Sequence, residues 1–208
     1  MNITVFGSKG RVGSAVVRIA AERKHVVTPV DIDEPITAGD SPDVVIDFSL
    51  PSATQTVVDY CAAHRCPLVS GVTGRNQLQQ RLVDGLSDKV KVVCSANFSE
   101  GANLLEELSA IVAERHPDWD VDIVETHRRQ KKDAPSGTAK HIAASVATKK
   151  GAFGKVTVHS LRSGTTFGTH SVIFGANGET LTLTHEAQSV DVFALGAILC
   201  AEKIVDEK

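Results

Sequence analysis

Short apolar runs alternate with helical patterns through the first half of the chain, and this alternation most constrains its fold. Runs rich in β-branched residues occupy positions 3–7, 25–31, 43–49, 67–72 and 90–96. Helical patterns lie between several of them, at residues 11–23, 52–64 and 76–86. Strands separated by helices in this way predict a parallel, doubly wound α/β sheet, because parallel neighbours need a crossover connection.

The pattern changes after a helical stretch at residues 99–115. A strand is expected at 121–127 and a helix at 136–148, followed by three strands of alternating apolar and polar residues within 155–188. Short glycine-containing turns join the last of these strands, which predicts an antiparallel sheet with one exposed face. The second half is therefore expected to have a smaller α+β architecture.

The last segment, DVFALGAILCAEKIV, has the apolar spacing of a helix. We expect this helix to pack back on the first domain. The predicted domains are residues 1–98 together with 189–208, and residues 99–188.

The first strand is followed by FGSKGRVGSAVV, in which Gly7, Gly10 and Gly13 have GxxGxxG spacing. Between a strand and a helix, such glycines allow a tight turn and close approach of the backbone to a pyrophosphate. The helix N-terminus adds N–H groups and a partial positive charge. Asp31 ends the second strand about 20 residues downstream, where an acid could bind a ribose diol. A turn without a ligand, with Asp31 as a helix cap, is the alternative.

A carboxylate at position 31 favours NADH over NADPH, because it would repel a 2′-phosphate. Lys9 and Arg11 could nevertheless accommodate that phosphate. Two other segments, GVTG (71–74) and SANF (95–98), follow the fourth and fifth strands. Ligands of parallel sheets bind at such strand ends, although ordinary turns would explain each segment alone.

The segment ETHRRQKKDAPSGTA places four cations between a histidine and a helix start. His127 is expected to end a strand. Pro135 or Ser136 would suit the first turn of a helix, with Asp133 as its cap. The N–H groups of the Ser-Gly-Thr corner would then favour an anion, and Lys131 could help to hold a substrate with two carboxylates. A solvated loop beside a structural histidine is the alternative.

Composition makes several classes of protein poor candidates. A net charge of −3 and a pI near 6.2 give no reason to expect a nucleic-acid partner. No apolar run approaches the roughly 18 residues of a membrane span, and MNITVFG enters a strand pattern without a leader, so we expect a cytoplasmic protein. The four cysteines form no CxxC pair and the eight histidines no HExxH motif, so no metal is expected.

Several segments, in order along nearly the whole chain, resemble the 4-hydroxy-tetrahydrodipicolinate reductase (dihydrodipicolinate reductase) family: GSKGRVG, VVIDFS, GVTG, SANFSEGANLL, ETHRRQKKDAPSGTA, VHSLRSG and GTHSVIFG. DAPSGTA and HSLRxG are the most specific. The resemblance implies a Rossmann-like cofactor domain beside a smaller mixed-sheet domain that binds substrate and builds a homotetramer. It also implies NAD(P)H-dependent reduction of 4-hydroxy-tetrahydrodipicolinate to tetrahydrodipicolinate in diaminopimelate and lysine biosynthesis.

The resemblance further implies roles for the matching residues. His127 matches the catalytic histidine, and Lys131 the lysine that donates a proton or holds substrate. A hydride delivered to ring C4 leaves negative charge, which either residue could quench as a general acid. The expected substrate-binding residues are Arg128, Ser136, Gly137 and Thr138. The expected cofactor-binding residues are Gly7, Ser8, Lys9, Gly10, Arg11, Val12, Asp31, Gly71, Val72, Thr73, Ser95, Ala96, Asn97 and Phe98.

Three positions depart from the family pattern. Arg128 stands where a second histidine is usual, Val72 where a threonine is usual, and Val190 where an arginine is usual. Arg128 could hold a carboxylate bidentately without titrating, so the pH dependence of binding would change. Two alternatives stay open: a reductase of another cyclic imine dicarboxylate, and a cofactor-binding regulatory protein that has lost catalysis.

Overall fold

The computed structural model describes residues 1–31 and 41–207. The chain forms two compact units, Met1–Phe98 with Val190–Lys208, and Ser99–Ser189. Residues 32–40 and position 208, which the predicted first domain includes, lie outside the described residues.

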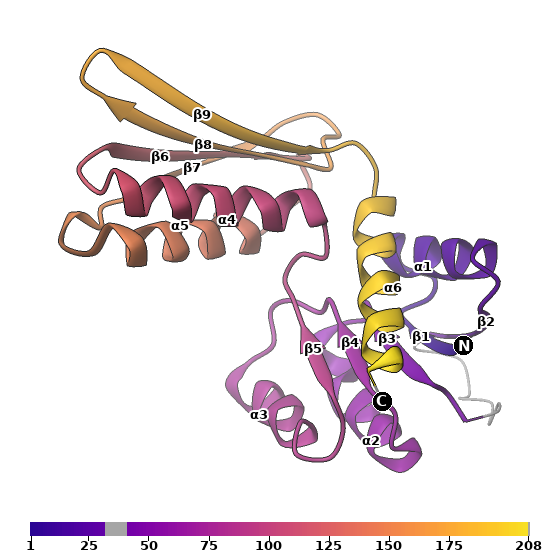
Figure 1. Cartoon of the computed structure of the whole chain (residues 1–208). Coiled ribbons are helices and arrows are strands. Elements are labelled where there is room, and N and C mark those ends of the chain that lie inside the picture. Colours follow the sequence, from indigo (N-terminus) through magenta and orange to yellow (C-terminus); the bar gives the residue numbers. More distant parts are fainter. Residues whose placement is uncertain (32–40, 208) are drawn as a thin grey trace. The chain divides into compact units, whose positions relative to one another are not determined.

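The first unit contains a five-stranded parallel sheet with the order β2-β1-β3-β4-β5 (Figure 1). Its strands are β1 (Asn2–Phe6), β2 (Val26–Val30), β3 (Val44–Asp47), β4 (Leu68–Ser70) and β5 (Val92–Cys94). The predicted doubly wound sheet is therefore confirmed. The strand order reverses between β1 and β3, so the carboxyl ends of these strands form the position where ligands bind in such sheets.

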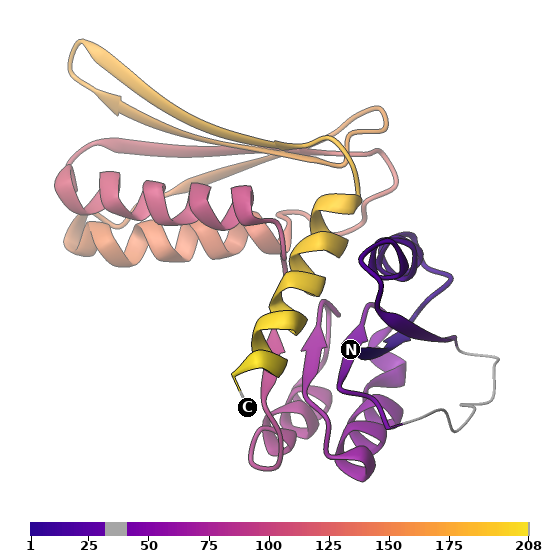
Figure 2. The same cartoon turned by 45° about the vertical axis from the view of Figure 1, so that its right-hand side comes forward.

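Helices cover both faces of this sheet (Figure 2). They are α1 (Arg11–Glu22) and α6 (Asp191–Asp206) on one face, and α2 (Thr54–His64), after a short 3₁₀ turn, with α3 (Gln77–Leu86) on the other. Val44 and Ile46 join the core beneath α1 and α6, whereas Val45 joins the core beneath α2 and α3. Burial on both sides explains the almost continuous apolar strands.

The second unit contains a four-stranded sheet with the order β7-β6-β8-β9. Its strands are β6 (Asp120–His127), β7 (Thr157–Arg162), β8 (Gly168–Ala176) and β9 (Glu179–Ala187). Helices α4 (Glu100–Arg115) and α5 (Gly137–Lys150) lie side by side on one face of the sheet (Figure 1). The core between these helices and the sheet includes Ile123, Ile142 and Phe174.

The antiparallel pairing expected for the three strands within 155–188 is correct for β8 and β9 but wrong for β7. Strand β7 runs parallel to β6. The physical reason is the connection: α5 forms a crossover between β6 and β7, whereas a glycine turn at Gly178, with φ +88°, joins β8 to β9. The sheet is mixed, as the family resemblance implies.

Local side-chain chemistry sets the start of α3 and of α4. Asn76 begins α3 with a capping box, in which its side chain and that of Gln79 each accept the other residue's backbone N–H at 2.9 Å. Ser99 begins α4 by accepting the Ala102 N–H at 3.3 Å. Each bond satisfies an N–H group that has no acceptor within its helix.

Candidate active site

The glycine loop between β1 and α1 has no room for side chains at its first and last glycines. Gly7 has φ +74°, and a Cβ there would lie 2.6 Å from the Phe48 carbonyl oxygen. A Cβ at Gly13 would lie only 2.0 Å from the Gly7 carbonyl oxygen, compared with 3.1 Å for a Cβ at Gly10. Positions 7 and 13 therefore require glycine for α1 to begin close to the ends of the strands.

Helix α1 begins without a side-chain cap. Gly10 is its N-cap, and the first helical hydrogen bond runs from Ser14 N–H to the Gly10 carbonyl at 2.8 Å. The N–H groups of Arg11, Val12 and Gly13 precede this bond and have no acceptor within the helix. A helix end of this kind, next to a glycine turn, is suited to a phosphate group.

Asp31 directly follows β2 beside this loop. One of its carboxylate oxygens accepts the Lys9 N–H at 2.8 Å. The N–H groups of Gly7 and Ser8 donate to the Val30 carbonyl at 3.0 and 3.2 Å. The predicted pyrophosphate loop and the predicted ribose-binding acid thus lie together. The N–H groups of positions 7 to 9 are already used within the protein.

The turns after β4 and β5 lie at the same carboxyl edge of the sheet and contain the expected nicotinamide-binding residues Gly71, Val72, Thr73, Ser95, Ala96, Asn97 and Phe98. Phe48, which the sequence interpretation missed, contacts both turns. A Cβ at Gly71 would lie 2.2 Å from the Phe48 ring, and the Phe98 ring lies edge-on to it with centroids 6.0 Å apart.

A buried ion pair, also missed from the sequence, anchors the turn after β4. Arg75 donates to the Asp47 carboxylate at 3.2 Å, and the two side chains are only 5% and 1% exposed. Asp47 also accepts hydrogen bonds from the Ser70 hydroxyl and from Ser49. Arg75 reaches the Val72 carbonyl at 3.4 Å. The only sequence signal was an aspartate that ends an otherwise apolar strand.

In the second unit, β6 carries Glu125 and His127 on the same face, because they are two residues apart in a strand. Both side chains are buried, and His127 Nδ1 lies 2.5 Å from Glu125 Oε2. Arg162 donates to both oxygens of this carboxylate, at 2.8 and 2.7 Å. The register of β7 places Arg162 directly opposite His127. Neither Glu125 nor Arg162 was predicted, although both lie in the quoted motifs.

Burial and charge act in opposite directions on this pair. Burial raises the pKa of Glu125, but hydrogen bonds from Arg162, Ser160 and His127 outweigh it and bring the pKa down to about 2. Burial lowers the pKa of His127 below its ordinary value, and the neighbouring Glu125 only partly opposes this. At neutral pH the pair is therefore an ionised carboxylate beside a neutral imidazole.

Ser136 caps α5, which corrects the expectation that Asp133 does so. The Ser136 hydroxyl accepts the Ala139 N–H at 3.2 Å, and the Ser136 N–H donates to Glu125 Oε1 at 3.1 Å. Asp133 lies too early in the chain for this role, and its carboxylate instead pairs with Lys131 Nζ at 2.8 Å.

The remaining predicted substrate residues surround this helix start. The first helical hydrogen bond of α5 runs from Lys140 N–H to the Ser136 carbonyl, so the N–H groups of Gly137 and Thr138 precede it. Arg128 and Lys131 belong to the loop that leads from β6 to α5, and the Lys131 N–H donates to the Arg128 carbonyl at 3.1 Å. The stretch thus combines cations with a helix end that favours anions.

Two family models match the chain: "Dihydrodipicolinate reductase, N-terminus" over residues 27–98 and "Dihydrodipicolinate reductase, C-terminus" over residues 101–208. The chain belongs to the dihydrodipicolinate reductase family. The reductases of this family are NAD(P)H-dependent oxidoreductases, so the resemblance seen in the sequence is confirmed.

Relatives cover the chain from end to end. The 4-hydroxy-tetrahydrodipicolinate reductase of Thermosipho africanus (strain TCF52B) is 38% identical over an alignment of 209 positions, which covers 100% of this chain and 93% of the relative. That of a Nitratiruptor species is 34% identical over an alignment of 241 positions, which covers 100% of this chain and 95% of the relative. A dipicolinate-bound dihydrodipicolinate reductase from Paenisporosarcina sp. TG-14 has the same fold, with a TM-score of 0.79, 21% identity and coverage of 99% and 95%.

Within residues 1–31 and 41–207, no helix has the length and apolar character needed to cross a membrane. The same part of this reductase holds no group of three or more His, Cys, Asp or Glu side chains placed to bind a metal ion. Its four cysteines are free thiols, of which Cys94 is exposed.

Proposed function

We propose that this chain reduces 4-hydroxy-tetrahydrodipicolinate to tetrahydrodipicolinate with NAD(P)H, in diaminopimelate and lysine biosynthesis. The observation that carries the proposal is the second unit's short stretch from β6 to α5. It joins a buried histidine–carboxylate pair, a lysine and a helix N-terminus. Family membership supplies the substrate, and this stretch contains the groups that a dicarboxylate and a proton transfer require.

We propose that the first unit binds the nicotinamide cofactor, which supplies a hydride when bound. The uncapped start of α1, with the Arg11 and Val12 N–H groups, suits the pyrophosphate. Asp31 suits the ribose hydroxyls and favours NADH, while Lys9 and Arg11 allow NADPH. The turns at 71–73 and 95–98 would face the nicotinamide.

We assign proton donation to Lys131. In this assignment, a neutral His127 donates its Nδ1–H to the ionised Glu125 carboxylate, so its Nε2 carries a lone pair and accepts hydrogen bonds. The Lys131 ammonium group pairs with Asp133 and remains 20% exposed, so it can give up a proton when hydride arrives at ring C4. His127 then orients a group of the substrate or a water molecule.

The substrate carboxylates would bind at the start of α5. The Gly137 and Thr138 N–H groups and the partial positive charge of the helix end favour one carboxylate. Arg128 is suited to hold a carboxylate bidentately. Ser136 serves mainly as the cap that places these N–H groups.

We further propose that the enzyme is a cytoplasmic homotetramer with a small dicarboxylate substrate. Both the location and the oligomeric state rest on the sequence and the family resemblance.

The proposal is tested by oxidation of NADH and NADPH coupled to the product of the pathway's synthase, and by complementation of a diaminopimelate auxotroph. We expect turnover and growth. A folded protein that binds dinucleotide but supports neither would refute the proposed reaction and favour the regulatory alternative. Faster turnover of another cyclic imine dicarboxylate would identify a different substrate, and Arg128 would then be the first residue to test as the cause of the changed specificity.

A further inference from the structure

The buried Glu125 carboxylate accepts hydrogen bonds from three elements of the second unit. Oε2 meets His127 Nδ1 on β6 at 2.5 Å and an Arg162 nitrogen on β7 at 2.8 Å. Oε1 accepts from the other terminal Arg162 nitrogen at 2.7 Å and from Ser136 N–H at 3.1 Å, where α5 begins. The side chain has no exposed surface, so these bonds replace its water.

Arg162 determines which nitrogen of His127 carries the hydrogen. A guanidinium that binds both oxygens keeps the carboxylate ionised. An ionised carboxylate only accepts hydrogen bonds, so the hydrogen between Glu125 and His127 must lie on Nδ1. His127 Nε2 then carries a lone pair, and this nitrogen is the one left for other groups.

The other groups around His127 are consistent with this neutral form. Lys131 and Arg162 lower the pKa of His127 through their positive charge. The centroids of the His127 ring and of the His170 ring, on β8, are 5.2 Å apart. Burial, together with the electrostatic effect of His127, lowers the pKa of His170 to about 4. A Cβ at Gly168 would lie 2.9 Å from His127 Nε2, so only a glycine leaves room for this edge of the ring.

We propose that Glu125, held by Arg162, is the positioning residue of the acid–base site. It fixes the Nδ1–H form of His127 and also anchors Ser136 at the start of α5. One carboxylate thereby sets the proton on the histidine and the place of the helix end that binds an anion. The kinetic consequence rests on the proposed function, whereas the tautomer of His127 is a property of the protein without substrate.

The test is Glu125→Gln, which keeps the size of the side chain and removes its charge. In protein labelled with ¹⁵N-histidine, signals of His127 are identified by their loss in His127→Asn. We expect a protonated Nδ1 and an unprotonated Nε2 in the wild type at neutral pH. In Glu125→Gln the new amide can donate to Nδ1, so the Nε2-protonated form appears.

Kinetics give a second measurement. Glu125→Gln should lower kcat about 10²-fold, the usual contribution of a positioned acid–base group, while the NADH dissociation constant stays unchanged. The acidic limb of the kcat/KM profile should move to lower pH, because the anion that favoured the imidazolium is gone. The matched control is Glu107→Gln, an exposed residue of α4, which should change none of these quantities.

A wild-type His127 protonated on Nε2 would overturn the inference, as would a Glu125→Gln enzyme with wild-type kcat. Should this variant fail to fold, Glu125→Gln with Arg162→Met removes both charges and leaves no unpaired buried cation, and the wild-type tautomer is still decisive. Failure of the proposed reaction has a different signature: the wild type does not turn the substrate over, yet the tautomer still changes in Glu125→Gln.

Discussion

Replacing Arg75 by methionine leaves Asp47 as a buried carboxylate without its cation. The paired side chains are 5% and 1% exposed, with 3.2 Å between Arg75 Nη2 and Asp47 Oδ2, so bulk solvent has little access to this carboxylate. Removal of one partner from such a pair typically costs about 3–5 kcal/mol. Asp47 keeps hydrogen bonds from Ser49 and Ser70, so we expect a loss near the lower limit, about 3 kcal/mol of the free energy of unfolding.

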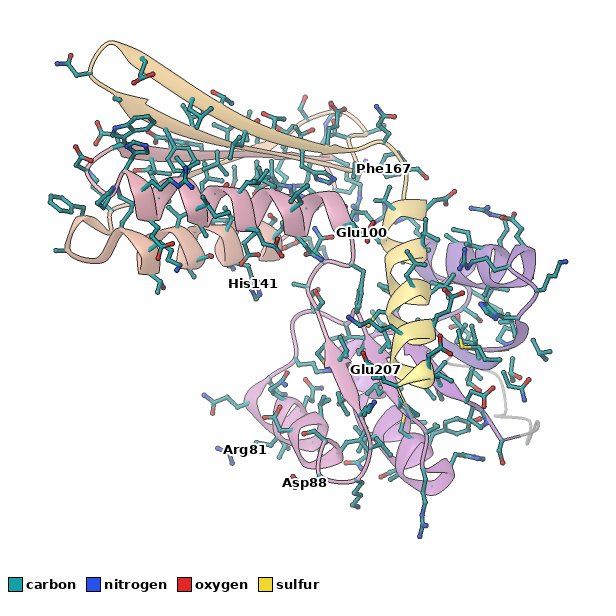
Figure 3. All side chains as sticks on the ribbon, viewed as in Figure 1. Arg81, Asp88, Glu100, His141, Phe167 and Glu207 are labelled. Carbon is teal, nitrogen blue, oxygen red and sulfur yellow. The ribbon has the colours of Figure 1, made fainter. Side chains whose placement is uncertain are left out.

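The assay is urea unfolding followed by circular dichroism, with NADH affinity measured on the folded variant. Arg75 also binds the Val72 carbonyl, so its loss should loosen the turn after β4 and weaken NADH binding. The matched control is Arg81→Met. Figure 3 shows Arg81 projecting outward from α3, and this variant should stay within about 0.5 kcal/mol of the wild type.

A double variant separates the ion pair from the loss of side-chain packing. With Asp47→Asn and Arg75→Met together, no buried charge lacks a partner, so the cost should be smaller than the sum of the two single costs by about 0.5–3 kcal/mol. A loss below about 1 kcal/mol for Arg75→Met, with an unchanged m value, would contradict the burial argument. A double variant whose cost equals the sum of the two single costs would also contradict it.

Three more predictions concern the loop, the proton donor and pH. Gly13→Ala should abolish NADH binding in a fluorescence titration, since its Cβ would lie 2.0 Å from the Gly7 carbonyl oxygen. Gly10→Ala should weaken NADH binding less, because its Cβ would lie 3.1 Å from that oxygen, and equal effects of the two variants would contradict the loop geometry. Lys131→Met should lower kcat by about 10² or more without changing NADH affinity, and Lys132→Met should change neither quantity. A Lys131→Met enzyme that loses kcat and NADH affinity by the same factor would refute the assignment of Lys131 to proton donation alone. The lowered pKa of Glu125 stabilises the fold above pH 4.5, and this stabilisation is lost as the pH falls toward about 2. In that interval the free energy of unfolding of Glu125→Gln, measured in urea, should therefore depend less on pH than that of the wild type.

Local patterns were sufficient for the elements of both units but not for every pairing between them. The run VVID is apolar on both alternating faces, and β3 is indeed buried on both sides. The direction of β7 could not be inferred from its own alternation, because an exposed strand of either direction alternates. It depends on the crossover through α5.

In the candidate site, too, residues close in the sequence could be predicted, whereas partners distant in the sequence could not. His127, Lys131 and the Ser-Gly-Thr corner are close in the sequence, so their neighbourhood could be predicted. Their partners could not: Arg162 lies 37 residues from Glu125, and only the register of β6 and β7 makes them neighbours. The cap of α5 was assigned to the wrong residue because local composition allowed both.

The sequence by itself determined the order of strands and helices, the glycine loop, and the stretch that carries the proposed acid–base chemistry. Such features depend on periodicity and on residues adjacent in the chain. The tertiary structure decided the charge state of that stretch, through the Glu125–Arg162 pair, and the anchoring of the turn after β4, through Asp47 and Arg75. Buried ion pairs depend on which strands meet and in which register, and a linear pattern does not contain that information.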